Sequence, residues 1–278
     1  MRKTIIFAAL AAVMCACSND EQSLESDELV DVSIGFSGFT YQQVAMTRTD
    51  GQVSDICTHL DIWLNDGTTT TAYHQATGDD GFGSLSVTLS LAKTYTIYAV
   101  AHKANGAATL ADGIISFPDD KVTHSFFISH DFTPTKNMSL NLTMNRIVSM
   151  FQFVTTDEVP DWCKTMRFTL YNVYDQWNVS TGGTHQLNRV STFQNFTKQN
   201  DGTVIFNIYA IVANTSTNHD ILIEGLNEDG DVLEYHTLKD VPLRNGYKTV
   251  ATGAFFTDAA SSFFFKAEDW PANIDYDF

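Results

Sequence analysis

Basic residues are scarce in this sequence. Sixteen Lys and Arg stand against 33 Asp and Glu among 278 residues, so the net charge is −17. Lys and Arg cluster nowhere along the chain, and proteins hold nucleic acids and anionic membrane surfaces mainly through such clusters. We therefore expect no nucleic-acid partner.

Motifs of catalysis and metal binding are missing as well. None of the eight His lies in a His-Glu-x-x-His or Cys-x-x-Cys frame, and the sequence has neither a Gly-x-Ser-x-Gly elbow nor a phosphate-binding glycine loop. His124 and His130 share a predicted strand face but lie too far apart to chelate a metal ion. The acidic residues 227–231 lack the bidentate Glu of an EF-hand loop and indicate a hairpin turn. We predict no enzymatic activity, no metal and no cofactor.

Apolar runs long enough to span a bilayer are also absent. The run at residues 4–14 follows Arg2 and Lys3 and is too short for a spanning helix, so we predict a signal peptide over residues 1–16. The run ends at Ala16-Cys17, which resembles a bacterial lipobox.

Cys17 is thus the predicted lipidated first residue of the mature chain. Cys15 is the weaker choice because the bulky Met14 precedes it, and a third interpretation makes Cys17 an apolar residue beside an ordinary cleavage point. Several acyl chains on one Cys anchor a protein stably. We expect residues 17–30 to form a flexible tether to the outer membrane.

Apolar and polar residues alternate with period two along the rest of the chain, and aromatic residues make up 12% of it, which together favour strands. Turns of the Asp-Gly type separate the runs, at Gly67, Gly81, Gly202 and Gly230. Residues 157–166 are the best short helix candidate. We predict an all-β fold with strands at residues 60–64, 85–91, 95–101, 138–144, 168–174, 204–212, 221–226, 232–238 and 247–256.

The strand-like residues 136–155 are interrupted only by the polar pair Asn145-Arg146. We place a domain boundary there, between β-sandwiches of residues 31–145 and 146–278. Cys57 and Cys163 then lie in different domains, 106 positions apart. Although they could form one disulfide, we interpret both as small buried residues.

Several segments, taken in order, point to a known family. The first half contains Leu60-Asp61-Ile62-Trp63-Leu64, the turn Asn65-Asp66-Gly67, a strand at residues 95–102 and Leu142-Thr143-Met144-Asn145-Arg146. The second half contains Leu222-Ile223-Glu224-Gly225-Leu226, Asp229-Gly230, and Val241-Pro242-Leu243-Arg244-Asn245-Gly246-Tyr247. Together with the lipobox, this order resembles the fimbrillins and fimbrial anchor proteins of the Bacteroidales.

The resemblance implies two tandem transthyretin-like, Greek-key β-sandwich domains. It also implies that the protein is a structural subunit or an anchor of cell-surface fimbriae, located at the outer membrane and involved in adhesion. Its partners would be other fimbrial subunits and ligands on host or bacterial surfaces.

Arg48 is the only Lys or Arg between Lys3 and Lys93. In the shaft fimbrillins that the chain resembles, a matching Arg marks where a protease removes the lipidated N-terminal strand, and a segment of the next subunit fills the groove. The resemblance implies cleavage between Arg48 and Thr49. We expect the donor strand at the Phe-rich C-terminal end, with Phe263, Phe264, Phe265, Trp270 and Phe278.

Two alternatives stay open. In the first, Arg48 is an exposed loop residue, residues 30–44 stay as a permanent edge strand, and the protein remains a lipid-tethered anchor. In the second, the protein is a lipid-anchored glycan-binding protein that stacks sugars on Trp162, Trp177 and Trp270, for which core packing is the simpler account.

Overall fold

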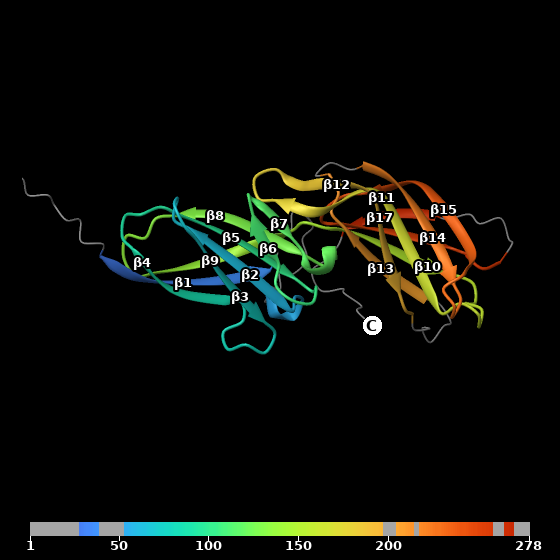
Figure 1. Ribbon diagram of the computed structural model, residues 1–278, viewed down its shortest axis with the longest axis horizontal. Helices are drawn as coiled ribbons and strands as arrows, with labels where there is room; N and C mark the ends of the chain where they lie inside the picture. The colour runs from blue at the N-terminus through green and yellow to red at the C-terminus, as the bar shows by residue number, and fades with distance from the viewer. Residues whose placement is uncertain (1–27, 39–52, 197–203, 214–216, 258–263, 270–278) are drawn as a thin grey trace, which may run out of the picture.

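The computed structural model describes residues 28–38, 53–196, 204–213, 217–257 and 264–269. Strands make up nearly all regular structure in these ranges, and no helix in them is long and apolar enough to cross a membrane. The strands form two groups that lie end to end along the long axis of the molecule (Figure 1). The predicted all-β fold of packed sheets is confirmed.

The first group forms a seven-stranded sheet in the order β3-β2-β5-β8-β9-β1-β4. The strands β8 and β9 join only at one end, where Phe126 and Phe127 pair with Arg146 and Asn145. Strands β9, β1 and β4 therefore form a second layer that packs over strands β3, β2, β5 and β8. The bounds are β1 Leu29–Gly38, β2 His59–Asn65, β3 Thr70–Ala76, β4 Ser84–Ser90, β5 Tyr95–His102, β8 Phe126–Phe132 and β9 Met138–Arg146, with the 3-10 helix η1 at Val53–Asp55.

A first apolar core fills the space between these two layers. Alternate residues of each strand enter it, as the period-two pattern predicts, because successive side chains of a strand point to opposite faces. Its most buried members include Val32, Ile34, Phe36, Leu60, Ile62, Ile97, Ala99, Phe126 and Met144. Cys57 is buried against the same core with a free thiol.

The second group consists of two further sheets. A four-stranded sheet has the order β13-β10-β16-β17, and it faces strands β15-β14-β11, with β12 also paired to β11. The bounds are β10 Ser149–Thr155, β11 Thr165–Asn178, β12 Gly182–Gln194, β13 Val204–Ala210, β14 Thr217–Leu226, β15 Val232–Leu243, β16 Tyr247–Gly253 and β17 Phe264–Asp269.

A second apolar core lies between these sheets and is rich in Phe. The rings of Phe153, Phe168, Phe206 and Phe255 lie within 6.2 Å of one another in successive pairs, centroid to centroid. Cys163 is buried beside them, also with a free thiol. Both cysteines are thus the small buried residues that the sequence predicts.

A short hairpin connects the two groups. Strands β6 (Thr109–Ala111) and β7 (Ile114–Ser116) precede the 3-10 helix η2 (Pro118–Asp120) in sequence, yet β7 pairs with the far end of β11. The predicted boundary at Asn145-Arg146 falls between β9 and β10, so the hairpin crosses it. The division into two domains stays a prediction.

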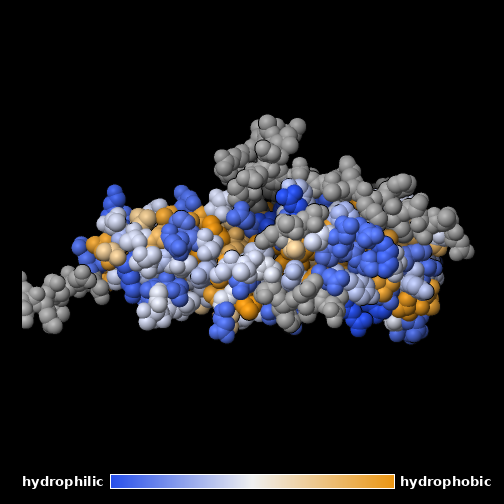
Figure 2. Space-filling view, turned by 90° about the horizontal axis from the view of Figure 1, so that it is seen from above, coloured by the Kyte–Doolittle hydropathy of each residue, from blue (hydrophilic) through white to orange (hydrophobic). Residues whose placement is uncertain are grey.

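A third apolar cluster lies where the two groups meet. It combines Trp63, Val100 and Phe127 of the first group with Ile115 of the hairpin, and with Val148, Met150, Trp177 and Ile211 of the second group. Because β2 and β5 pack against the first core on one face and this cluster on the other, most of their residues are buried. Over the face that Figure 2 shows, apolar residues lie in patches between hydrophilic ones.

Three of the predicted Asp-Gly turns are present. Gly67, Gly81 and Gly230 each have a positive φ of 79–87°, a conformation that residues with a Cβ seldom adopt. The fourth, at Gly202, lies outside the described residues.

Candidate functional site

The first strand of the described chain, β1, lies between two neighbours. It pairs antiparallel with β4 and parallel with β9, so Ile34 lies opposite Leu85 on one side and Leu140 on the other. Its alternate side chains enter the first core, where each is at most 7% exposed: Val30, Val32, Ile34 and Phe36.

Polar contacts hold both ends of β1. The backbone N–H of Asp31 donates to Asn137 Oδ1 (3.0 Å), and the N–H of Phe36 donates to the Gly83 carbonyl (2.8 Å). Between Leu140 and Gly35 there is little free space, because a Cβ on this glycine would lie 3.1 Å from Asn141 Oδ1. The strand therefore fits tightly between residues 84–90 of β4 and residues 138–144 of β9. We call this space the β1 slot.

The position of β1 corrects one prediction. The alternative in which residues 30–44 form a permanent edge strand is wrong for residues 30–38, because β1 lies between β9 and β4 and the outer strand of this layer is β4; residues 39–44 lie outside the described residues. Alternation in the sequence identifies the buried face of a strand, whereas its neighbours depend on pairing with residues far along the chain.

The predicted donor end is partly described. Phe264 and Phe265 lie in β17, which pairs antiparallel with β16 from Thr252↔Phe264 to Tyr247↔Asp269. Strand β17 is the outer strand of its four-stranded sheet, and within the described chain β16 is its only sheet neighbour. The other predicted site residues lie outside the described ranges: Cys17, Arg48, Thr49, Phe263, Trp270 and Phe278.

The tryptophans do not form the platform proposed for sugars. Trp177 is only 8% exposed and belongs to the third apolar cluster. Trp162 is partly buried beside the second core, with its ring edge-on to Phe256 (5.8 Å). Trp270 lies outside the described residues. Trp162 and Trp177 thus serve packing, which corrects the predicted sugar platform for these two residues.

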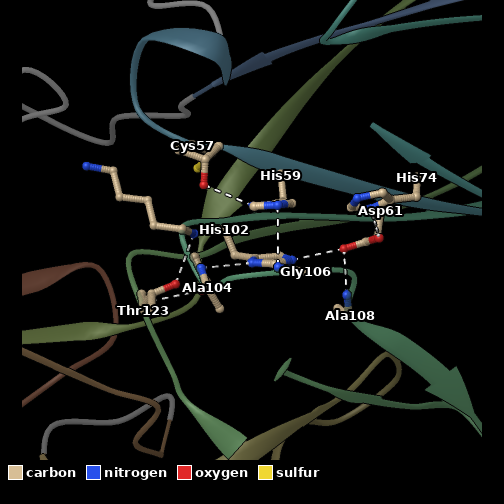
Figure 3. Close-up of polar contacts among 12 residues, drawn as sticks. Cys57, His59, Asp61, His74, His102, Ala104, Gly106, Ala108 and Thr123 are labelled. Atoms are coloured by element: carbon tan, nitrogen blue, oxygen red, sulfur yellow. Dashed lines mark hydrogen bonds and ion pairs between the residues drawn. The ribbon is translucent and has the colours of Figure 1, made fainter. Parts of the chain in front are cut away.

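A histidine–aspartate cluster occupies one end of the first group (Figure 3). The buried Asp61 of β2 lies between two imidazoles: Oδ1 is 2.7 Å from His74 Nδ1, and Oδ2 is 2.9 Å from His102 Nε2. Its Oδ2 also accepts the backbone N–H of Ala108 (2.9 Å). One carboxylate thereby ties together β2, β3, β5 and the segment leading into β6.

His59 stacks with both of the other imidazoles. Its ring centroid is 5.4 Å from those of His74 and His102, and its Nε2 lies 3.4 Å from the Gly106 backbone N–H that donates to it. Burial lowers the pKa of His59 most, followed by the neighbouring His102 and His74, whereas Asp61 raises it. The cluster therefore favours a neutral His59.

Strand register creates this cluster, which a search for short motifs misses. His59 lies opposite His102, and Asp61 lies opposite His74 across the hairpin around Gly67. The sequence does contain one signal for the cluster: His59 and Asp61 lie two positions apart, on one face of a predicted strand, and a predicted hairpin follows them. Among the described residues, no group of three or more His, Cys, Asp and Glu is arranged to hold a metal ion.

Comparisons with known proteins give a family and a fold. Residues 115–278, more than half of the chain, match the sequence model of a family of unknown function, DUF6562. No curated protein sequence matches the chain.

Among solved structures, a candidate adhesin from Bacteroides ovatus is 9% identical, with a TM-score of 0.53 over 85% of this chain and 95% of its own. A candidate cell adhesion protein from the same organism is 14% identical, with a TM-score of 0.51 over 89% of this chain and 100% of its own. The fimbrial anchor protein Mfa2 from Porphyromonas gingivalis is 9% identical, with a TM-score of only 0.45 over 87% of this chain and 98% of its own. The predicted resemblance to Bacteroidales surface proteins is confirmed at the level of the fold.

Proposed function

This chain belongs to DUF6562, a family of unknown function, and we propose that it is a structural subunit or an anchor of cell-surface fimbriae that takes part in adhesion. The fold that it shares with candidate adhesins of Bacteroides supports a role at the cell surface. The predicted signal peptide and lipidated Cys17 would place it at the outer membrane. Its role is mechanical and adhesive, not catalytic.

One observation supports the proposed mechanism: β1, the first described strand, fills the β1 slot between β4 and β9. Fully burying an aliphatic or Phe side chain contributes about 1.5–3 kcal/mol. The four inward residues of β1 therefore contribute roughly 6–12 kcal/mol, comparable with the whole net stability of a domain, about 5–15 kcal/mol. A chain that lost β1 would need another strand in the same place.

An extended segment of a neighbouring subunit is the natural replacement. Loss of β1 would leave the N–H and C=O groups of β4 and β9 unpaired along a row of apolar side chains, and such an edge binds a strand from another chain. The incoming strand would run parallel to β9, with apolar residues at alternate positions. Cleavage after Arg48 falls between β1 and η1, so β1 would then be held by noncovalent contacts alone and could be exchanged for another strand.

We keep the C-terminal end of the chain as the proposed donor of the strand that fills the β1 slot of the next subunit. Strand β17 has one sheet neighbour among the described residues, so its release breaks one ladder of hydrogen bonds and not two. Residues 258–278 would then extend from one subunit into the β1 slot of the next. Without cleavage, β1 keeps its place and the protein serves as a lipid-tethered anchor.

A protease experiment tests the cleavage step. We expect a trypsin-like protease to convert the purified chain into a species that begins at Thr49 and polymerises, as seen by N-terminal sequencing and light scattering. An added peptide of residues 28–38 should compete for the slot and stop growth. The Arg48→Gln variant should stay uncut and monomeric. Cut protein that remains monomeric would show that strand donation is wrong.

Two truncations locate the donor. A chain ending at Asp269 keeps β17 and loses residues 270–278, whereas a chain ending at Thr257 loses β17 as well. If β17 is the essential part of the donor, only the longer chain should polymerise after cleavage. Equal polymerisation of both truncated chains would exclude the C-terminal end as donor.

A further inference from the structure

A row of four side chains crosses the outer face of the second group. Arg167 of β11 lies opposite Phe193 of β12 on one side and opposite Glu224 of β14 on the other, and Glu224 lies opposite Tyr235 of β15. Residues directly paired in antiparallel strands share a face, so all four side chains stand on the same side of the sheet. We call these four residues the outer row.

Aromatic rings stand at both ends of the outer row. Phe193 is 60% exposed and Tyr235 is 64% exposed, among the most exposed large apolar side chains of the described residues. Neither belongs to an apolar core. Adjacent strands lie about 4.8 Å apart, so three strand spacings separate the two backbone positions by about 14 Å. Exposed rings at this separation are unexplained by the packing of the chain.

The centre of the outer row is polar and electrically balanced. Arg167 donates from Nε to Glu224 Oε2 and from Nη2 to Oε1, both at 2.6 Å, and its guanidinium carbon lies 5.7 Å from the centroid of the Phe193 ring. One pair of hydroxyls lies alongside, where Oγ1 of the buried Thr169 and Oγ of Ser191 are 2.8 Å apart. The two charges hold each other in place and cancel.

We propose that the outer row is a binding site for a neutral glycan, lying flat across β12, β11, β14 and β15. A pyranose ring has a face of C–H groups that stacks on an aromatic ring, and a rim of hydroxyls that can both donate and accept hydrogen bonds. The exposed rings of Phe193 and Tyr235 supply the stacking surfaces. Between them the guanidinium of Arg167, whose side chain is 29% exposed and is held in place by the buried Glu224, supplies charged donors, which make strong hydrogen bonds.

The chemistry of the row selects this ligand over two others. A stable protein partner would bury about 1,200–2,000 Å² in total, whereas this row offers two isolated rings separated by a salt bridge. An acidic polymer would meet a chain of net charge −17, and the guanidinium of Arg167 is already paired with a carboxylate. An uncharged chain of several sugar rings fits both the spacing and the charge. This proposal is independent of strand donation.

Affinity electrophoresis of the full chain tests the site. Gels would contain neutral polysaccharides (an α-glucan, a β-glucan, a xylan or a galactomannan) or the acidic polygalacturonate. We expect at least one neutral glycan to retard the protein and polygalacturonate to have no effect. Phe193→Ala and Tyr235→Ala should each weaken binding about tenfold, Tyr235→Phe should retain it, and the double alanine variant should migrate freely.

The controls separate binding from folding. Leu29→Ala removes a side chain of similar exposure, 61%, from the other end of the molecule and should bind like the unaltered protein. All variants should keep the thermal midpoint of the unaltered chain, because the replaced side chains lie outside the cores. No retardation by any neutral glycan, retardation by polygalacturonate alone, or unchanged binding by the double variant would each overturn the proposal.

Discussion

The carboxylate of Asp157 accepts a hydrogen bond from the backbone N–H of Phe255, 98 positions further along the chain (2.9 Å). Its second oxygen accepts the N–H groups of Phe256 (2.5 Å) and Thr257 (2.9 Å). One side chain that follows β10 thus fixes the segment that follows β16. This segment leads toward β17, the predicted donor strand.

Replacing Asp157 by Ala should therefore destabilise the second group of strands. Three backbone N–H groups would lose their acceptor, and an unsatisfied, partly buried donor costs about 1–3 kcal/mol. We expect urea unfolding to show a loss within this range or somewhat above it. Asp161→Ala changes an exposed carboxylate in the same loop and should have little effect. Equal losses in both variants would mean that the Asp157 contacts do not contribute.

The histidine–aspartate cluster predicts a pH dependence of stability. The pKa of His59 is lowered in the folded chain from its ordinary value of 6.5, mainly by burial, so the unfolded chain binds its proton more readily. The share of stability that depends on a neutral His59 is therefore present above about pH 6.5 and is lost as the pH falls toward the lowered pKa.

The variant His59→Gln should flatten this slope in unfolding free energies measured between pH 7.5 and 5. His130→Gln, on β8 and away from the cluster, is the matched control and should keep the slope of the unaltered protein. A slope that survives in His59→Gln would assign the dependence to other groups.

Trp177 links the two groups of strands through the third apolar cluster. Trp177→Ala would leave a cavity there, and such truncations typically cost about 3–5 kcal/mol. If the groups are separate domains held by this interface, calorimetry should show the unfolding transition of the intact chain split into two. Trp162→Ala, beside the second core, should lower stability without splitting the transition. One undivided transition in Trp177→Ala would count against two domains.

The lipid anchor can be tested at the two candidate cysteines. Cys17→Ala should release the protein from the membrane fraction or leave it as an uncleaved precursor, because a single lipidated Cys is the predicted anchor. Cys15→Ala is the control and should leave the protein in the membrane fraction. Release by Cys15→Ala alone would move the predicted anchor to that residue.

Strand positions were predictable because they depend on local alternation. Predicted residues 204–212 and 138–144 closely match β13 and β9, and the turns at Gly67, Gly81 and Gly230 are present. The helix predicted for residues 157–166 is wrong, because residues 157–164 form a loop, β11 begins at Thr165, and Asp157 binds backbone groups about 100 positions away.

Long-range pairing explains what the sequence could not predict about the candidate sites. The place of β1 between β4 and β9 depends on partners 49–106 positions away, and the alignment of Arg167 with Phe193 and Glu224 depends on partners 26 and 57 positions away. Burial of Trp177 depends on the meeting of the two groups. In each case the residue type was visible in the sequence, but its neighbours were set by register.

The double pairing of β1 also has a mechanical consequence. A pull at residue 28 from the predicted tether, directed along the strand, would load the hydrogen bonds to β4 and β9 in shear, so all of them would have to stretch together. A strand peeled from an edge would instead lose its bonds one after another at low force. The first described strand is therefore suited to withstand tension from its N-terminal side, and a cut at Arg48 would leave its contacts with the neighbouring strands as the only connection that carries the load.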